Sequence, residues 1–376
     1  MSKAAELANL IGNINAGGGG VNRNVLVNGA TNVSQRSVSS TGLGASAGYF
    51  TADRWKFQVA NTAGRFTATQ DSSVPTGKGF ANSIKFACTT ADTSIASTEQ
   101  FIFQQKLEGQ NLQGFAKGTS EAKPFALSFY VKGNASATYV VALYDEDNGR
   151  YVGKTFSVTT DWTRVEITFP ADTTGALDDD NASSLELWIW LHCGPTYKGG
   201  TLPLTWASYS NANAAEGGDS FFDSTSRTFF ITGLQLEVGQ NCTEFEHINN
   251  FGEELARCQR YFYAFQNPGT ANDVLESAFL ATAYNDNSAY GPVFFPTEMR
   301  AQASISADGA WATRQGNNNE ISNASSNFGM QRKSTNMVLV AIGSGISSVS
   351  AGNAFWIEPY SGYNPNTAKL HFSAEL

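Results

Sequence analysis

The sequence predicts a mainly β protein with more than one domain. Its 376 residues exceed an average domain and are enough to bury substantial cores. Gly contributes 36 residues and aromatic residues 12%, whereas charged residues make up only 15%. Aromatic and β-branched residues separated by Gly and Asn are typical of antiparallel sheets. We therefore predict a short helix with a Gly-rich linker over 1–20, an antiparallel jelly-roll β-sandwich over 21–246, a linking helix over 247–266 and a smaller β domain over 267–376.

The N-terminal segment has helical periodicity. Ala4, Leu7, Ala8 and Ile11 follow the i, i+3, i+4, i+7 pattern, Ser2 is available as N-cap, and Gly12 with the glycine run at 17–20 is expected to end the helix. Such a short helix is marginal alone in water and needs a surface against which to bury its apolar stripe. We expect it to anchor the protein to a larger assembly or to bundle with copies of itself. The alternative is a frayed terminus.

Short strands separated by turns follow over 21–246. They include LSFYVKG, ATYVVALYD, TRVEITFP, LELWIWL and TFFITGLQLEV. Asn148-Gly149 is typical of a tight hairpin turn, because both residues accept positive φ angles. The acidic DEDNG stretch does not have the spacing of an EF-hand calcium loop, so a plain hairpin is the favoured interpretation. Jelly-roll sandwiches are built from strands of this length and spacing.

The segment LELWIWL, residues 185–191, has two apolar faces. Leu185, Leu187, Ile189 and Leu191 alternate with Glu186, Trp188 and Trp190. The first set is expected to face the core. The outer tryptophans either pack against other protein surface, which we favour, or stack on sugar rings.

A second helix is expected after 246, because Phe251, Leu255, Cys258 and Phe262 share one helical face. The acidic residues come first and Arg257 and Arg260 later, as the helix dipole prefers. The β segments beyond it have long polar loops between them.

Several classes of function are excluded by composition. The net charge of −9 and the lack of a basic cluster argue against nucleic-acid binding. No run of 18 apolar residues is present for membrane insertion, and the N-terminus lacks the basic flank and long apolar core of a signal peptide, so folding in a cytoplasm is expected. The four cysteines are widely spaced, which predicts buried free thiols. His192, His247 and His371 have no nucleophile signature beside them, and no acidic pair is distinguishable, so we expect no enzyme.

The order of several motifs resembles one group of viral proteins. These motifs are NRNVLVNGATNVSQRS, GYFTADRW, FIFQQKLEGQNLQGF, FITGLQLEVG, EELARCQRYFY and FPTEMR, and the resemblance runs over nearly the whole chain. Together they resemble structural proteins of tailed bacteriophages, many of them from marine phages, that are described as tail fibres or carbohydrate-binding-like virion proteins. The opening Asn24–Gly29, with its N-x-L-x-N-G pattern, also resembles jelly-roll carbohydrate-binding modules.

The resemblance implies a trimeric tail fibre in the virion that attaches the particle to host surface polysaccharide and docks on other virion proteins through its N-terminal segment. The alternatives are a head or tail decoration protein that binds no receptor and, less favoured, a glycan depolymerase. Long parallel β-helix repeats, which depolymerising tailspikes tend to have, are absent from the sequence.

Candidate binding residues are loop aromatics with neighbouring amide and acidic groups, because sugars need an apolar face and hydrogen-bond partners. In the C-terminal domain, which would form the tip of the fibre, they are Trp311, Tyr284, Asn285, Asp286, Tyr360, Tyr363 and Asn364; in the sandwich they are Trp206 and Tyr209, with Tyr197 nearby. No cofactor is expected. The resemblance to carbohydrate-binding modules does imply a structural calcium between the first and last strands, with Glu237 and Asn28 as its ligands.

Overall fold

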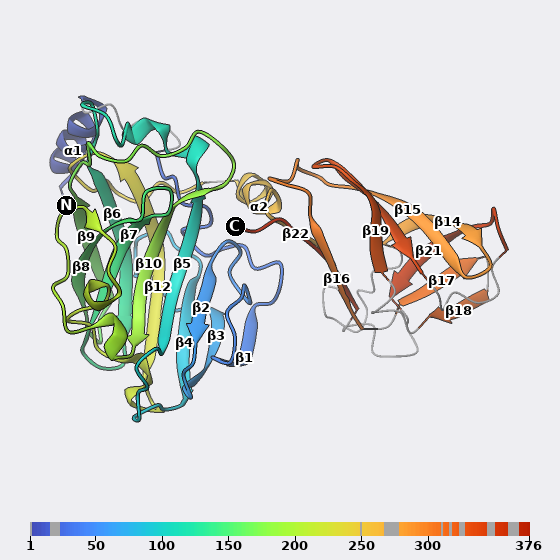
Figure 1. Ribbon diagram of the computed structural model, residues 1–376, viewed down its shortest axis with the longest axis horizontal. Helices are drawn as coiled ribbons and strands as arrows, with labels where there is room; N and C mark the ends of the chain where they lie inside the picture. The colour runs from blue at the N-terminus through green and yellow to red at the C-terminus, as the bar shows by residue number, and fades with distance from the viewer. Residues whose placement is uncertain are drawn as a thin grey trace. The chain divides into compact units, whose positions relative to one another are not determined.

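The computed structural model describes residues 2–15, 23–248, 250–266, 278–309, 311–315, 318–322, 328–343, 350–359 and 368–376. The chain divides into two compact units, Met1–Glu254 with Leu376, and Leu255–Glu375 (Figure 1). Both are built mainly of antiparallel strands, which confirms the predicted fold class.

The first unit is a sandwich of two six-stranded antiparallel sheets. In sheet order, the first contains β1 (Ser39–Leu43), β3 (Arg65–Asp71), β4 (Ser83–Thr90), β12 (Thr228–Val238), β6 (Phe125–Gly133) and β9 (Thr163–Phe169). The second contains β11 (Ala207–Ser208), β8 (Arg150–Val158), β7 (Ala137–Asp145), β10 (Ser183–Cys193), β5 (Gln100–Glu108) and β2 (Lys56–Ala60). The chain crosses repeatedly from one sheet to the other, as in a jelly roll, and Figure 1 shows the two sheets stacked face to face.

Aromatic side chains fill the space between these sheets. Phe66 stacks on Phe101 with ring centroids 4.5 Å apart, and Phe57 meets Phe86 edge to face at 5.4 Å. Offset and edge-to-face contacts of this kind are the preferred geometries of aromatic rings. All four rings are fully buried. Each such ring contributes about 1.5–3 kcal/mol through its burial alone.

The last strand of the sandwich lies beside the opening segment of the chain. Val25 N donates to Leu236 O at 3.0 Å and Leu234 N to Gly29 O at 3.0 Å, so β12 lies beside the opening segment. The hairpin between β7 and β8 is also confirmed, with Gly149 at a φ of 62°. All four cysteines are free and buried, as expected.

Helix α1 (Lys3–Asn15) is longer than predicted, because it continues through Gly12. One glycine costs a helix only about 1 kcal/mol, so it need not end one. Ser2 is the N-cap: its Oγ accepts from Ala5 N at 3.2 Å. The stripe of Ala4, Leu7, Ala8 and Ile11 is exposed. No helix in the described part of the chain is long and apolar enough to span a membrane.

Helix α2 (Phe251–Gln259) is shorter than predicted. Phe262 begins strand β13 instead of ending the helical face, because the aromatic run after Arg260 favours a strand.

The second unit has a three-stranded and a seven-stranded antiparallel sheet. The smaller sheet contains β13 (Phe262–Gln266), β22 (Lys369–Ser373) and β16 (Ser304–Asp308). The larger contains β18 (Asn318–Ser322), β17 (Trp311–Gln315), β21 (Ala354–Pro359), β14 (Phe279–Asn285), β15 (Ser288–Phe294), β20 (Met337–Ile342) and β19 (Phe328–Lys333). Alternating residues such as Val338, Val340 and Ile342 form a separate core.

A fully buried ion network supports the sandwich. The ammonium of Lys117 contacts the carboxylates of Asp145 and Asp172, at 3.1 Å for Asp172, and lies over the ring of Trp206 at 4.9 Å. The Lys117 and Asp145 side chains are both 0% exposed. A buried carboxylate that loses its cation is strongly destabilising.

We predict that Lys117→Met lowers the free energy of unfolding by about 3–5 kcal/mol, because it leaves Asp145 buried without its cation. Urea unfolding followed by circular dichroism measures this difference. The matched control is Lys85→Met, which breaks the half-exposed pair with Asp71 at 3.9 Å; a change of at most about 1 kcal/mol is expected there. Equal effects of the two variants would contradict the assignment.

Candidate functional site

Strand β10 carries one face of the core and one face of the candidate site. Leu185, Leu187, Ile189 and Leu191 are fully buried between the sheets. Glu186, Trp188 and Trp190 lie on the outer face of the second sheet, as the alternation predicts. The strand therefore links the packing of the sandwich directly to the geometry of its outer surface.

A long connection covers half of this outer face. The segment between β10 and β12 packs Ala214 and Ala215 against Tyr151, Val140 and Trp190 to form a second buried cluster. Tyr151 holds it in place: its hydroxyl donates to Ala214 O at 2.6 Å and accepts from Trp190 Nε1 at 3.2 Å. The other half of the face, over β10, β5 and β2, is left open, although Trp190 of β10 and Ile102 of β5 also belong to this cluster.

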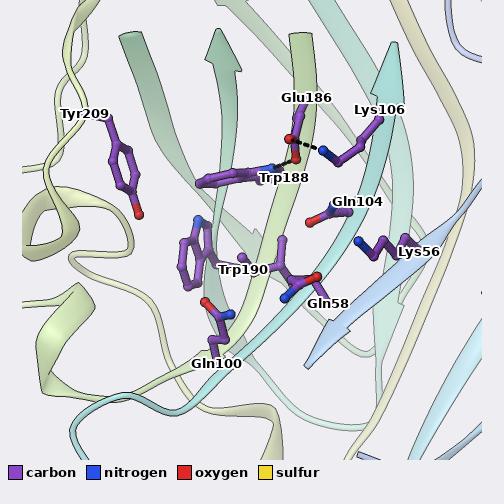
Figure 2. Close-up of a pocket in the computed structure, with 10 residues that line it drawn as sticks. Lys56, Gln58, Gln100, Gln104, Lys106, Glu186, Trp188, Trp190 and Tyr209 are labelled. Atoms are coloured by element: carbon purple, nitrogen blue, oxygen red, sulfur yellow. Dashed lines mark hydrogen bonds and ion pairs between the residues drawn. The ribbon is translucent and has the colours of Figure 1, made fainter. Parts of the chain in front are cut away.

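The uncovered half contains a groove of about 240 Å³. Its aromatic wall consists of Trp188, Trp190 and Tyr209, and its polar floor of Gln58, Gln100 and Gln104. Figure 2 shows the two tryptophans between Tyr209 and the three glutamines. The remaining lining residues are Lys56, Ile102, Lys106 and Glu186.

The orientation of Trp188 is fixed by contacts on two sides. Its ring stacks on Tyr144 at 4.7 Å and meets Tyr209 edge to face at 5.8 Å. Its Nε1 donates to Glu186 Oε2 at 2.6 Å. The side chain is half-buried, so part of the ring faces the groove. A ring held in this way loses little conformational entropy when a ligand stacks on it.

One end of the groove is charged. Lys106 Nζ lies 2.8 Å from Glu186 Oε1 and 3.2 Å from Glu146 Oε2. Burial works against the charge of Lys106, but the two carboxylates outweigh it and raise its pKa. Burial also raises the pKa of Glu186, although Lys106 opposes this. For Glu146, burial is outweighed by hydrogen bonds and by Lys106, which lower its pKa. The ammonium thus holds both carboxylates as acceptors.

The two aromatic residues predicted to bind ligand in the sandwich, Tyr209 and Trp206, have different surroundings. Tyr209 stands in the aromatic wall, held by the bond from its own N to Gly149 O at 2.8 Å. Trp206 is buried, and the prediction that it meets a ligand is wrong. Its Nε1 donates to Pro170 O at 2.8 Å, and its ring packs on Phe125 beneath Lys117. The neighbouring candidate Tyr197 packs on Trp190 at 5.2 Å.

The predicted binding residues of the second unit also differ in their exposure to solvent. Trp311 is only 1% exposed, because its position in β17 faces the core, so the prediction of a surface role for it is wrong. Tyr284, Asn285 and Asp286 lie exposed at the β14–β15 hairpin. The Asn285 side chain is used in the turn, where it accepts from Asn287 N at 2.9 Å and Ser288 Oγ at 2.8 Å.

The remaining candidates of this unit, Tyr360, Tyr363 and Asn364, lie outside the described residues.

Glu237 and Asn28 do not fit a shared calcium ion. Glu237 is buried beneath Thr243, whose N and Oγ1 donate to it at 2.8 and 2.9–3.0 Å, and Arg23 Nε lies 3.4 Å from its Oε2. The Asn28 side chain donates to Val33 O at 2.8 Å and Asp53 O at 3.0 Å. Calcium takes six or more oxygens, and these groups already have protein partners. The positive charge beside the Glu237 carboxylate comes from the guanidinium of Arg23.

The floor and the charged end of the groove were missed by sequence reasoning. Lys56, Gln58, Gln100, Gln104 and Lys106 come from β2 and β5, which are separated in the sequence by two strands of the other sheet. Their alternation along each strand marks an outer face. Which strands lie beside β10 depends on long-range pairing, for which short-range patterns give no signal.

No protein-family model matches the chain, and no curated protein matches it. Among solved structures, it is similar to the enzymatically active domain of tailspike protein 4 of bacteriophage CBA120, with 12% identity and a TM-score of 0.31 over 57% of this chain and 21% of that chain. It is also similar to the family 11 carbohydrate-binding module from Clostridium thermocellum, with 12% identity and a TM-score of 0.26 over 55% of this chain and 99% of that chain.

A third similar structure is TmCBM61 in complex with β-1,4-galactotriose, with 11% identity and a TM-score of 0.29 over 57% of this chain and 99% of that chain. Because all three TM-scores are low, we interpret the groove from its own residues.

Burial raises the pKa of Glu237 despite its hydrogen bonds from Thr243. The folded state therefore binds this proton more tightly than the unfolded chain, and the free energy of unfolding falls as pH rises from the unfolded pKa to the folded one. We predict that Glu237→Gln removes this part of the pH dependence. Urea unfolding of both proteins from about pH 4 to about pH 7 tests it. The stability of the wild type relative to the variant should decline with pH; a constant or rising difference would contradict the prediction.

Proposed function

We propose that the groove over β10, β5 and β2 binds a short stretch of a polysaccharide chain. One observation carries this proposal: a fixed aromatic wall faces a floor of three glutamine side chains in a single groove. Sugar rings have apolar C–H faces that cover aromatic rings, and hydroxyl groups that need donors and acceptors. A glutamine amide supplies both.

The solvent exposure of each side chain in the groove indicates which part of the ligand it would contact. Trp188 and Tyr209 are half-buried and offer surface for a sugar ring, whereas Trp190 is only 2% exposed and supports them from below. Gln58 and Gln100 are half-buried and would bond to hydroxyls of the ligand, whereas Gln104 is buried. The Lys106–Glu186 pair adds a charged donor and acceptor at one end. A ligand with hydroxyls along one edge and a bare ring face suits this arrangement.

We propose binding without catalysis. The pKa values of Glu186, which lines the groove, and of Glu146, which contacts the same Lys106, move apart, a pattern that an acid and base pair would have. Both, however, are bonded to the same ammonium, and Glu186 also accepts from Trp188 Nε1. A carboxyl held in this way has no free proton to give to a leaving group.

At the level of the particle, we propose a trimeric tail fibre of a tailed bacteriophage that attaches the virion to host surface glycans. The support is the resemblance of the sequence motifs together with the exposed stripe of α1, which is free to dock on another virion protein. Several copies at the end of a virion would offset weak single sites through avidity. A decoration protein on the head or tail is the alternative; it needs the same docking helix but no groove.

Trp188→Ala should weaken glycan binding about tenfold or more, because it removes the stacking surface; tenfold corresponds to about 1.4 kcal/mol. A bacterial polysaccharide array identifies the ligand, and calorimetry with the full chain measures the affinity. Trp356→Ala is the matched control, since Trp356 is 47% exposed in the second unit and outside the groove. Equal affinities of the wild type and Trp188→Ala would refute the assignment of the groove.

Leu7→Asp and Ile11→Asp should each abolish incorporation into virions, because each places a charge in the apolar stripe of α1. The fold should stay intact, because the two side chains are 57% and 49% exposed. Immunoblots of purified particles measure incorporation, and Lys3→Asp is the control for a charge change off the stripe. Imaging of the particles separates the two architectures, because a fibre projects from the tail whereas a decoration protein lies flat on the shell or tube. Normal incorporation of both variants would exclude α1 as the anchor.

A further inference from the structure

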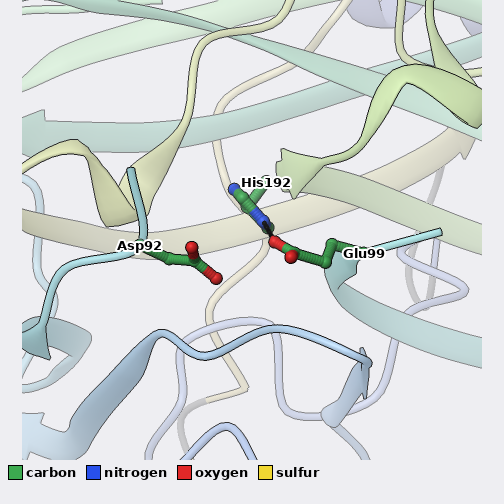
Figure 3. A group of neighbouring side chains, drawn as sticks. All are labelled: Asp92, Glu99 and His192. Atoms are coloured by element: carbon green, nitrogen blue, oxygen red, sulfur yellow. Dashed lines mark hydrogen bonds and ion pairs between the residues drawn. The ribbon is translucent and has the colours of Figure 1, made fainter. Parts of the chain in front are cut away.

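A buried cluster of two carboxylates and one imidazole lies outside the groove, where β4 ends and β5 begins. Asp92 and Glu99 belong to the connection between these strands, and His192 lies near the end of β10. The three residues are 5%, 3% and 1% exposed. One ligand atom from each lies within 4.8 Å of the other two. Figure 3 shows the three side chains directed toward one another.

His192 reaches the cluster through an irregularity in β10. The register between β10 and β5 shifts between Trp190 and His192, so that His192 pairs with the core residue Phe101. A shift of one residue moves a side chain to the opposite face of a sheet. Trp190 therefore points to the outer face, whereas the His192 ring lies inside, 5.1 Å from Phe222.

Each of the three side chains has one polar atom held by the surrounding chain. Asp92 Oδ2 accepts from Thr62 Oγ1 and Ala63 N, both at 2.8 Å. Glu99 Oε1 accepts from Ala96 N at 2.6 Å, and His192 Nδ1 bonds to Ser220 Oγ at 2.8 Å. The second polar atoms, including His192 Nε2 and Glu99 Oε2 at 3.0 Å from each other, remain for the centre of the cluster. Metal ligands are oriented by outer hydrogen bonds of this kind.

The cluster also lacks positive charge. Among the described residues, no Lys or Arg forms an ion pair with Asp92 or Glu99, and the one ionic partner is His192, on Glu99. A buried carboxylate is costly unless it is paired, protonated or bound to a metal. One imidazole cannot balance two carboxylates, whereas a divalent cation can.

We propose that Asp92, Glu99 and His192 bind one divalent metal ion of the zinc class. An imidazole combined with carboxylates suits Zn²⁺, while Ca²⁺ and Mg²⁺ prefer oxygen ligands alone. Ligand distances of about 2.0–2.2 Å need only a small inward movement of the three groups, with His192 Nε2 exchanging Glu99 for the ion. A water molecule or a second carboxylate oxygen completes a tetrahedron. The ion would tie the β4–β5 connection to the end of β10 and so stabilise the sandwich.

The test uses the full chain, stripped of metal with a chelator, dialysed and titrated with ZnCl₂. The site predicts about one Zn²⁺ per chain and a higher melting temperature with Zn²⁺. Co²⁺ distinguishes the ligands, because a site of oxygen and nitrogen ligands lacks the thiolate charge-transfer bands that the four cysteines would produce. No stoichiometric binding by the folded wild type would overturn the proposal, and a proton shared by the two carboxylates would then account for the cluster.

Substitution of the proposed ligands tests which residues bind the metal ion. Asp92→Asn and His192→Gln should each weaken binding by more than the roughly 10–100-fold lost when only an outer partner of a ligand is removed. His247→Gln is the matched control, because His247 bonds to Lys78 O at 2.9 Å, away from the cluster. Wild-type affinity in both cluster variants, or thiolate bands with Co²⁺, would refute the site. Circular dichroism checks folding; should either variant fail to fold, Glu99→Gln and the wild-type Co²⁺ spectrum decide.

Discussion

The hydroxyl of Tyr151 determines which part of the second sheet is available to a ligand. It is buried between Trp190 and Ala214 and bonds to both. Burial raises the pKa of Tyr151 well above its ordinary value, so it keeps its proton and remains a donor. The connection that follows β10 is thereby fixed over β7 and β8. The surface over β5 and β2 stays open. Tyr209, at the edge of the covering connection, lines one side of the groove there.

The same strand supplies core and site, which couples stability to function. In β10, Leu185, Leu187, Ile189 and Leu191 fill the core, and the residues between them, Glu186, Trp188 and Trp190, line the groove. Pairing with β5 places Trp188 beside Gln104 and Glu186 beside Lys106. The wall and the floor are therefore positioned by backbone hydrogen bonds, so the proposed ligand would require little further ordering of the groove. A change that shifts this register would damage both at once.

The sequence allowed the fold class, the alternation of β10 and the hairpin at Asn148-Gly149 to be predicted, because each depends on a local period or turn. Local patterns gave the wrong result where tertiary packing decides. Trp206 and Trp311 stand in polar surroundings in the sequence, yet both rings are buried.

The floor of the groove and the Asp92–Glu99–His192 cluster have no local signature. The floor arises from pairing of distant strands, and the cluster from a register shift that turns His192 inward. Simple alternation would place His192 on the same face as Trp190. The Arg23–Glu237 pair likewise joins residues more than 200 positions apart in the sequence, which local patterns do not predict.

Stacking of a sugar on the aromatic wall of this groove can be observed in a crystal structure. The crystals should contain the full chain with the oligosaccharide that binds best on a glycan array. We expect density for a sugar ring parallel to Trp188, with hydroxyls bonded to the glutamine floor. A sugar bound at the β14–β15 hairpin or elsewhere, with the groove empty, would contradict this expectation.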